Sequence, residues 1–310
     1  MTKIKNPLSS STFAHRHLPE RLHVYIVFEL NSLLILRYQR VCAAARAVNA
    51  LSFVDAVHYA PHDVLDVTII GCDFLACSPY KFYGPHSGVL FGRKGLLGDN
   101  AVMRPWKIRT SDDTLAYDET YQMSKWELGT PNFEAMAGVT ACVDYIASVG
   151  ERYGGHLNGT NRSNSCTRRS CSSGGGGGTV STSRRANIEA GWDLVRAHEN
   201  TLKRRFLSGA EGVPGLRVYG VSGVDRVAER TSTFAVGYTD GRDPDALTQQ
   251  LAKEDGIYCT SGNHYCTFWD RDFGPQYGLD DVNGVTRIGF LHYNSVGEVD
   301  RVLEALERRK

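Results

Sequence analysis

The chain has 310 residues, which is enough for one large and one smaller domain, each with its own core. Hydrophobic residues make up 42% of it and charged residues 22%, the composition of an ordinary globular protein. The net charge of +1 argues against a nucleic-acid or membrane-surface partner that is held mainly by electrostatics.

An apolar run at 23–38 is short for a bilayer and contains Glu29 and Asn31. It also starts too far from the N-terminus to be typical of a signal peptide. The eight cysteines include no Cys-x-x-Cys pair, so we expect buried reduced thiols rather than a zinc ribbon or a thioredoxin-type motif. These features predict a cytoplasmic protein without a membrane segment.

Residues 1–37 are polar and Ser-rich at first and then apolar, and we treat them as a segment of their own. Residues 38–154 alternate helical and strand patterns, which predicts a parallel sheet covered by helices on both faces. The elements expected in this part are a helix at 38–49, strands at 51–54, within 64–77 around Asp66 and Asp73, and at 88–91, and a helix at 132–149 after Pro131.

Residues 155–186 are rich in Asn, Ser, Arg and Gly and contain five consecutive glycines at 174–178. Such a composition cannot bury enough apolar surface to offset its ordering entropy, so it predicts a flexible insertion. The alternative is a glycine-rich loop that cradles phosphate, but such a loop needs a strand before it and a helix start after it.

The last part, 187–310, predicts a linking helix followed by a small α/β domain. The linking helix begins near Ala186 and ends near Ser208. The elements expected after it are strands at 216–221, 231–236, near 257 and at 287–290, and helices at 243–254 and 296–308.

An acid and a lysine stand at the ends of two strand patterns. Asp55 ends the first, and Lys81 follows 26 positions later (81 − 55), between an apolar run and a Gly-Pro turn. Pyridoxal phosphate (PLP) needs a lysine amine for its Schiff base and an anion beside its pyridine nitrogen, so the pair favours a PLP site. A lysine by itself is usually a solvated surface residue, and a strand-end aspartate can simply cap a turn.

Four stretches of the chain, in the same order, resemble class V aminotransferases and above all their cysteine desulfurase-like branch: 54–66, 73–97, 126–132 and 284–302. The resemblance implies the α/β architecture of PLP-dependent fold type I, with a large domain on a mostly parallel sheet and a small C-terminal α/β domain. The resemblance implies that the large domain is incomplete, because family members carry a long N-terminal half before the helix expected near Tyr38. That half supplies a phosphate-binding loop and an aromatic residue stacked on the cofactor, and 1–37 matches neither.

The resemblance also implies roles for individual residues. Lys81 would be the catalytic residue, which holds PLP and then moves the α-proton of an amino acid. The residues implied to bind the cofactor are Asp55 at the pyridine nitrogen, His58 at the phenolic oxygen, Ser78 and Tyr80 at the phosphate, Lys81 itself, and Thr130, which reaches the phosphate of the neighbouring protomer in a homodimer. Arg287 would bind the substrate α-carboxylate through its guanidinium fork. The Gly-Thr-Pro-Asn turn that contains Thr130 is also plain capping chemistry.

Besides the unmatched N-terminal half, one feature separates the chain from working desulfurases. In those enzymes a mobile loop presents a cysteine, and here Tyr265 takes that position with Cys266 one place later. We therefore do not expect desulfuration by the usual route, while transamination, C–S cleavage and epimerisation all begin with the same α-proton loss. His264 and Cys266 are too few ligands to indicate a metal site.

The alternative hypothesis is a non-catalytic remnant of this fold, or an incomplete gene model, that binds no cofactor. The missing N-terminal half favours that alternative, whereas the retained Asp55, Lys81, Thr130 and Arg287 oppose it. Because a Schiff base is reversible, the loss of two cofactor contacts predicts weak retention of PLP and slow turnover at most.

Overall fold

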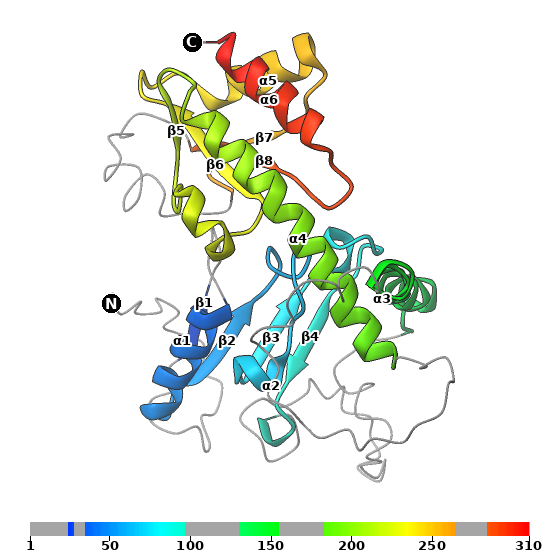
Figure 1. Cartoon of the computed structure of the whole chain (residues 1–310). Helices are drawn as coiled ribbons and strands as arrows, with labels where there is room; N and C mark the ends of the chain where they lie inside the picture. Colours follow the sequence, from blue (N-terminus) through cyan, green and yellow to red (C-terminus); the bar gives the residue numbers. More distant parts are fainter. Residues whose placement is uncertain (1–23, 28–34, 97–129, 155–182, 265–283, 310) are drawn as a thin grey trace.

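The computed structural model describes residues 24–27, 35–96, 130–154, 183–264 and 284–309. Its two sheets lie in separate halves of the molecule, and the long helix α4 (Arg184–Ala210) runs from one half to the other (Figure 1). The expected insertion at 155–186 lies outside the described residues as far as 182, and residues 184–186 already belong to α4.

The first sheet contains four strands in the order β1-β2-β3-β4. They are β1 (Val24–Val27), β2 (Leu51–Asp55), β3 (Phe74–Cys77) and β4 (Val89–Gly92). The first three run parallel and β4 pairs antiparallel with β3, so the sheet is mostly parallel, as predicted. Because β1 lies within the segment 1–37, that segment contributes a strand to this sheet.

Three helices belong to the same half: α1 (Ile35–Ala47), α2 (Val67–Ile70) and α3 (Phe133–Tyr153). Side chains of α1, α2, β2 and β3 form one core, which includes Tyr38, Cys42, Val54, Ile70 and Leu75. The prediction of a strand around Asp66 is wrong. The Asp66 carboxylate instead caps α2, accepting hydrogen bonds from the amides of Thr68 at 2.9 Å and Ile69 at 3.3 Å.

Coverage of both faces of this sheet is incomplete in the described part of the chain. Successive residues of a strand point to opposite faces. On β4 both Val89 and Leu90 are exposed, at 41% and 56%. The first two side chains of this edge strand, one on each face, are therefore open to solvent, whereas Phe91 packs against the core of the sheet.

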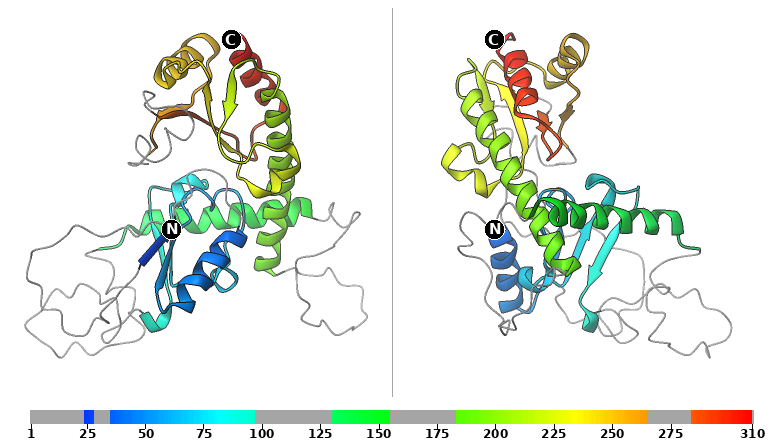
Figure 2. Two further views of the ribbon diagram at one scale, coloured as in Figure 1. Left: turned by 90° about the vertical axis from the view of Figure 1, so that its left-hand side faces the viewer. Right: turned by 45° about the vertical axis from the view of Figure 1, so that its right-hand side comes forward.

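Helices α3 and α4 cross in direct backbone contact beside the first sheet (Figure 2). Glycines permit this approach from both helices. A Cβ atom on Gly150 would lie 1.9 Å from the carbonyl oxygen of Asn187, and one on Gly191 would lie 2.3 Å from that of Ile146. The crossing therefore fixes the start of α4 against the first half of the molecule.

The second half is a small antiparallel α/β unit whose strands follow the order β5-β6-β8-β7. Its strands are β5 (Leu216–Val218), β6 (Thr233–Tyr238), β7 (Thr260–Gly262) and β8 (Val285–Gly289), and its helices are α5 (Pro244–Asp255) and α6 (Val296–Glu307). Its core joins α4 to the sheet and both helices, through residues that include Leu202, Phe206, Phe234, Leu251, Ile288 and Leu306. This unit agrees with the predicted small domain, although β7 begins three residues after Ile257 (260 − 257).

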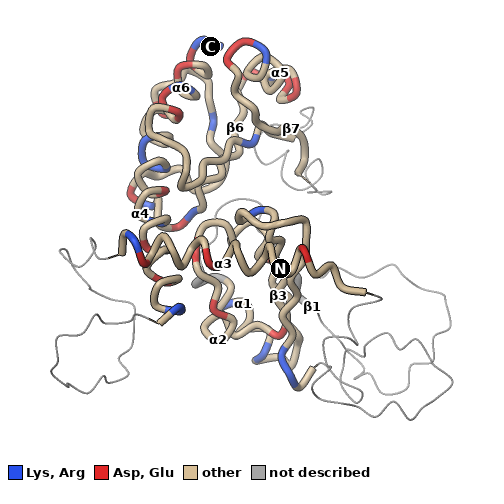
Figure 3. Tube along the Cα trace, turned by 90° about the vertical axis from the view of Figure 1, so that its right-hand side faces the viewer, with Lys and Arg blue, Asp and Glu red and all other residues tan. Residues whose placement is uncertain are grey.

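Basic and acidic residues are interspersed along α4, α5 and α6 (Figure 3). Among the helices of the described ranges, none combines the length and the apolar character needed to cross a bilayer.

Candidate active site

The predicted acid and lysine follow two neighbouring parallel strands. Asp55 is the last residue of β2 and is paired in register with Ala76 of β3. Lys81 ends the short 3-10 turn η1 (Pro79–Lys81), which begins two residues after β3. Because ligands bind outside the carboxyl ends of parallel strands, the topology brings both residues to the edge of the sheet where a site is expected.

The turn that carries Lys81 is tightly closed. The Gly84 amide donates to the carbonyl oxygen of Pro79 at 2.9 Å. A Cβ atom on Gly84 would lie 2.9 Å from the Pro79 side chain and 3.0 Å from its carbonyl oxygen, so a larger residue does not fit. Ser78 stands at the N-cap of η1, and its hydroxyl makes no capping hydrogen bond.

Tyr80 projects from this turn and is 46% exposed. Its ring stacks on the imidazole of His86 with the centroids 5.0 Å apart and an angle of 15° between the planes. Lys81 Nζ lies 5.4 Å from the centroid of the Tyr80 ring, a cation–π distance. Tyr80 and Lys81, which the resemblance implies to bind the cofactor, therefore lie side by side, with the phenol near the amine.

Asp55 also has a local role. Its Oδ1 atom accepts a hydrogen bond from the amide of Val57 at 3.0 Å. This contact is the turn-capping role that a strand-end aspartate commonly has. It uses one of the two carboxylate oxygens, so it is compatible with a second partner for Asp55.

Arg287 comes from β8 of the small domain and meets the first half at His58. Its Nη1 atom lies 3.3 Å from His58 Nε2. Burial, followed by the positive charges of Arg287 and Lys81, lowers the pKa of His58 from 6.5 to about 4. His58 is therefore neutral at pH 7 and can accept this hydrogen bond. The charges of Lys81 and Arg287 both act on this one imidazole.

His264 lies two residues after the end of β7. Its backbone is in the left-handed region, with φ at 49°, and its Nε2 atom lies 3.3 Å from the carbonyl oxygen of Val285. Burial and the charge of Arg287 lower its pKa. Residues 265 and 266, where we expected Tyr265 to replace a loop cysteine, lie outside the described residues.

Thr130 is exposed at the start of α3. The capping role that we expected for this turn is fulfilled by Asn132, whose Oδ1 atom accepts from the amide of Ala135 at 3.0 Å. The described contacts do not join Thr130 to Lys81 or Arg287.

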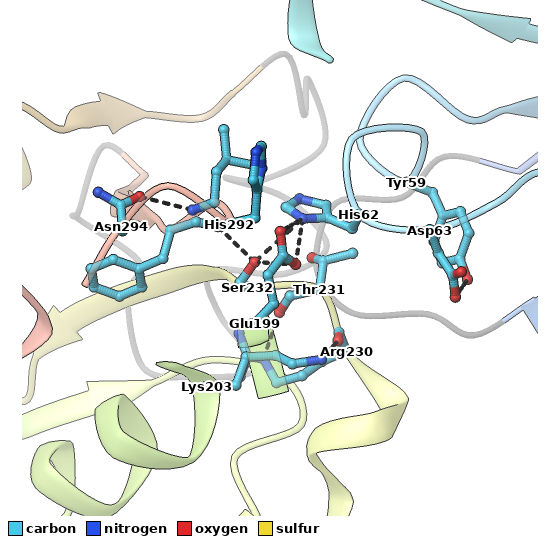
Figure 4. A network of polar contacts seen from close by, with 12 residues as sticks. Tyr59, His62, Asp63, Glu199, Lys203, Arg230, Thr231, Ser232, His292 and Asn294 are labelled. Atoms are coloured by element: carbon cyan, nitrogen blue, oxygen red, sulfur yellow. Dashed lines mark hydrogen bonds and ion pairs between the residues drawn. The ribbon is translucent and has the colours of Figure 1, made fainter. Parts of the chain in front are cut away.

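A buried polar cluster joins the two halves beside this site, and sequence patterns do not indicate it (Figure 4). His62 Nδ1 lies 2.8 Å from Glu199 Oε2. Ser232 Oγ lies 2.7 Å from the same carboxylate oxygen and 2.6 Å from the carbonyl oxygen of Phe290. His62, Glu199 and Ser232 are 8%, 2% and 0% exposed, so a carboxylate from α4 is shared between the large and small domains without solvent.

A second contact between the halves is centred on His292, and it too was missed. Tyr83 Oη lies 2.8 Å from His292 Nδ1, and Tyr145 Oη lies 2.6 Å from His292 Nε2. These rings line a pocket of about 510 Å³ together with Tyr293 and Cys142. The sequence signal near this contact was the Tyr-Gly-Pro stretch after Lys81, and it does not identify the partner of Tyr83, which lies 209 positions away.

The comparisons with known proteins identify the class to which this fold and site belong. The model of the aminotransferase class-V family matches residues 25–153 and 185–302, and the chain belongs to this family. The matched region begins within 1–37, the segment that we expected to lie outside the resemblance.

Curated relatives include an aminotransferase-like protein, FGM3, of Gibberella zeae, which is 29% identical over 259 residues, 83% of this chain and 51% of the relative. A cysteine desulfurase of Pectobacterium carotovorum is 32% identical over 305 residues, 94% of this chain and 59% of the relative. The chain thus spans between half and three-fifths of the length of these relatives.

Among solved structures, the apo structure of a cysteine desulfurase from Thermococcus onnurineus NA1 is similar to this chain, with a TM-score of 0.59 and 21% sequence identity. The likeness covers 88% of this chain and 55% of that one. The predicted fold class, the α/β architecture of fold type I, is confirmed, with the chain covering part of its structural neighbours.

Proposed function

We propose that the chain is part of a PLP-dependent enzyme that acts on an amino acid, with Lys81 as the residue that holds the cofactor covalently. The observation that carries this proposal is the contact of Arg287 with His58, at the strand edge that also carries Asp55 and the Lys81 turn. The positive charges of Arg287 and Lys81, which come from separate halves, both act on this imidazole, and two such cations suit a ligand with anionic groups at both ends.

The residues present fit PLP. Lys81 supplies the amine, Asp55 an anion for the pyridine nitrogen, and Ser78 a hydroxyl that no capping bond occupies. When bound, the cofactor supplies an electron sink for the carbanion that an amino acid forms on losing its α-proton. The amine of Lys81 would take up that proton, and Arg287 would orient the substrate through its carboxylate.

The neutral state of His58 suits a site with two cations. A protonated imidazole beside Arg287 and Lys81 would add a third positive charge, and the low pKa of His58 shows that this form is disfavoured. Because His58 Nε2 accepts from Arg287, its Nδ1 atom carries the proton and is the donor available to a ligand oxygen. Tyr80, next to Lys81, would add a phenolic donor for the phosphate.

We also propose that the protein acts as a homodimer in the cytoplasm, with Thr130 serving the site of the partner. The exposed position of Thr130 at the start of α3 supports this role, since a residue that acts across an interface must be accessible in the single chain. Sedimentation of the purified chain would test the dimer.

Covalent trapping tests the central proposal. The chain is incubated with PLP, reduced with borohydride and digested, and the modified lysine is located by mass spectrometry. We expect modification at Lys81, its loss in Lys81→Ala, and its retention in Lys94→Ala, a matched change in the next 3-10 turn, η2 (Lys94–Leu96). Equal modification of both lysines would contradict the proposal and favour the alternative, a remnant of the fold that binds no cofactor.

The reaction is assigned by its products. A chain that binds PLP is supplied with an amino acid, and the release of an oxo acid is compared with the release of sulfide from cysteine. Arg287→Ala should weaken amino-acid binding at least tenfold, since a charge-assisted pair of hydrogen bonds is lost. Arg217→Ala, an exposed arginine on β5 of the same sheet, serves as the control.

A further inference from the structure

The Lys81 turn and the Arg287 strand are joined by a hydrogen-bonded bridge of three side chains. Tyr83 is two residues beyond Lys81, and His292 is five residues beyond Arg287 (292 − 287). Both ring nitrogens of His292 are engaged, Nδ1 by Tyr83 at 2.8 Å and Nε2 by Tyr145 of α3 at 2.6 Å. The small domain therefore meets the large domain at a point close in sequence to both candidate residues.

Tyr83 has an unusual backbone that its surroundings must impose. Its φ angle is 73°, in the left-handed region that bulky residues seldom occupy. Its ring meets those of His292, Tyr145 and Tyr293 edge-on, with centroids 4.8, 5.5 and 6.5 Å away. A sparsely populated conformation persists only when neighbouring contacts hold it, and these three rings and one hydrogen bond are such contacts.

The other end of the bridge is equally fixed. The residues around His292 form a tight turn, in which the Leu291 amide donates to Asn294 Oδ1 at 2.9 Å and the Asn294 amide donates to the Leu291 carbonyl oxygen at 2.9 Å. His198 of α4 lies 2.8 Å, through Nε2, from the carbonyl oxygen of Asn294. The imidazole of His292 is thus carried by a rigid turn that directly continues β8.

We propose that His292 is a positioning residue, which sets the Lys81 turn relative to the Arg287 strand through its hydrogen bonds to Tyr83 and Tyr145. The inference rests on the proposed function, in that Lys81 and Arg287 act on one ligand. A neutral imidazole donates from one nitrogen and accepts at the other, so it can order two phenols at once. Burial lowers the pKa of His292, which favours this neutral form.

The test compares His292→Phe, which keeps an aromatic ring but removes both hydrogen bonds, with His292→Gln, which can still donate and accept. In the cofactor-free chain we measure hydrogen exchange of the Gly84 amide, which closes the Lys81 turn on Pro79. We expect exchange about tenfold faster or more in His292→Phe, and exchange near the wild-type rate in His292→Gln. Tyr153→Phe, an exposed tyrosine of α3, is the control and should exchange as the wild type does.

In the chain loaded with PLP, we expect His292→Phe to raise the KM for the amino acid about tenfold while PLP affinity stays within about twofold, and His292→Gln to restore most of the KM. Unchanged exchange at Gly84 would overturn the inference, and so would faster exchange with an unchanged KM. If the wild type takes up no PLP at Lys81, the proposed function fails. Exchange at Gly84 then still decides whether the bridge holds the turn.

Discussion

Replacing His58 with glutamine should remove part of the acid sensitivity of the fold. The pKa of His58 is about 4 in the folded chain, against 6.5 for a free imidazole, because of burial and the charges of Arg287, Lys81, His62 and His264. Between these two values the unfolded chain binds a proton that the folded chain does not. The free energy of unfolding therefore falls as the pH falls from 6.5 to 4. A change of 2.5 (6.5 − 4) in pKa corresponds to about 3 kcal/mol at most.

The assay is urea unfolding of the cofactor-free chain at several pH values, followed by tryptophan fluorescence. Above pH 7 His58 is neutral in both states, so wild type and His58→Gln should differ by a constant amount there. Below pH 6.5 the wild type should lose stability faster, by up to about 3 kcal/mol at pH 4. In Arg287→Ala the free energy of unfolding should fall less steeply with decreasing pH than in the wild type, since the substitution removes the second cause of the low pKa of His58.

A direct measurement accompanies the unfolding curves. The imidazole resonance that is absent from the NMR spectrum of His58→Gln should titrate near pH 4 in the wild type. Titration near 6.5, or parallel loss of stability in both chains, would refute the argument that burial and the charges of Arg287 and Lys81 keep His58 neutral.

Three further predictions concern the packing that supports the site. Glu199→Ala should destabilise the chain by about 3 kcal/mol in urea unfolding, because His62 loses its buried partner, whereas a loss under 1 kcal/mol would contradict this. Gly150→Ala should cost about 3 kcal/mol or more by the same assay, because its methyl group meets a backbone oxygen at 1.9 Å. Gly88→Ala, with open space around it, is its control, and equal effects would refute the argument. Asp66→Ala should cost about 1 kcal/mol through the lost cap of α2, and an unchanged urea midpoint would count against that cap.

The sequence predicts the elements well where local patterns are strong. The helix after Pro131 and the strand that ends at Asp55 are both present in the structure, since capping signals and apolar periodicity act over a few residues. Asp66 was misassigned because a short apolar run can be a strand or a helix, and the deciding hydrogen bonds are those of the cap. That Asp55 and Lys81 follow two neighbouring parallel strands agrees with the order of elements predicted from the sequence, and a topological rule makes that edge of the sheet the expected place of a site.

The contacts between the halves could not be predicted in this way. His62 and Glu199 are 137 positions apart, and Tyr83 and His292 are 209 apart, so no local period relates them. Within its own stretch of sequence, each of these residues can also be interpreted as an ordinary surface or core residue. Their pairing depends on how α4 orients the small domain, which is a property of tertiary packing.

That orientation matters because the candidate site is divided between the two sheets. Lys81 follows β3 of the first and Arg287 belongs to β8 of the second, so no single domain contains both groups. A displacement of about 1 Å between reacting groups can cost about a hundredfold in rate, so the junction must be as rigid as the site itself. The close crossing of α3 and α4, the shared Glu199 carboxylate and the His292 bridge constrain that junction at three places. Residues far from the reacting atoms would therefore control the chemistry through the angle between the two halves.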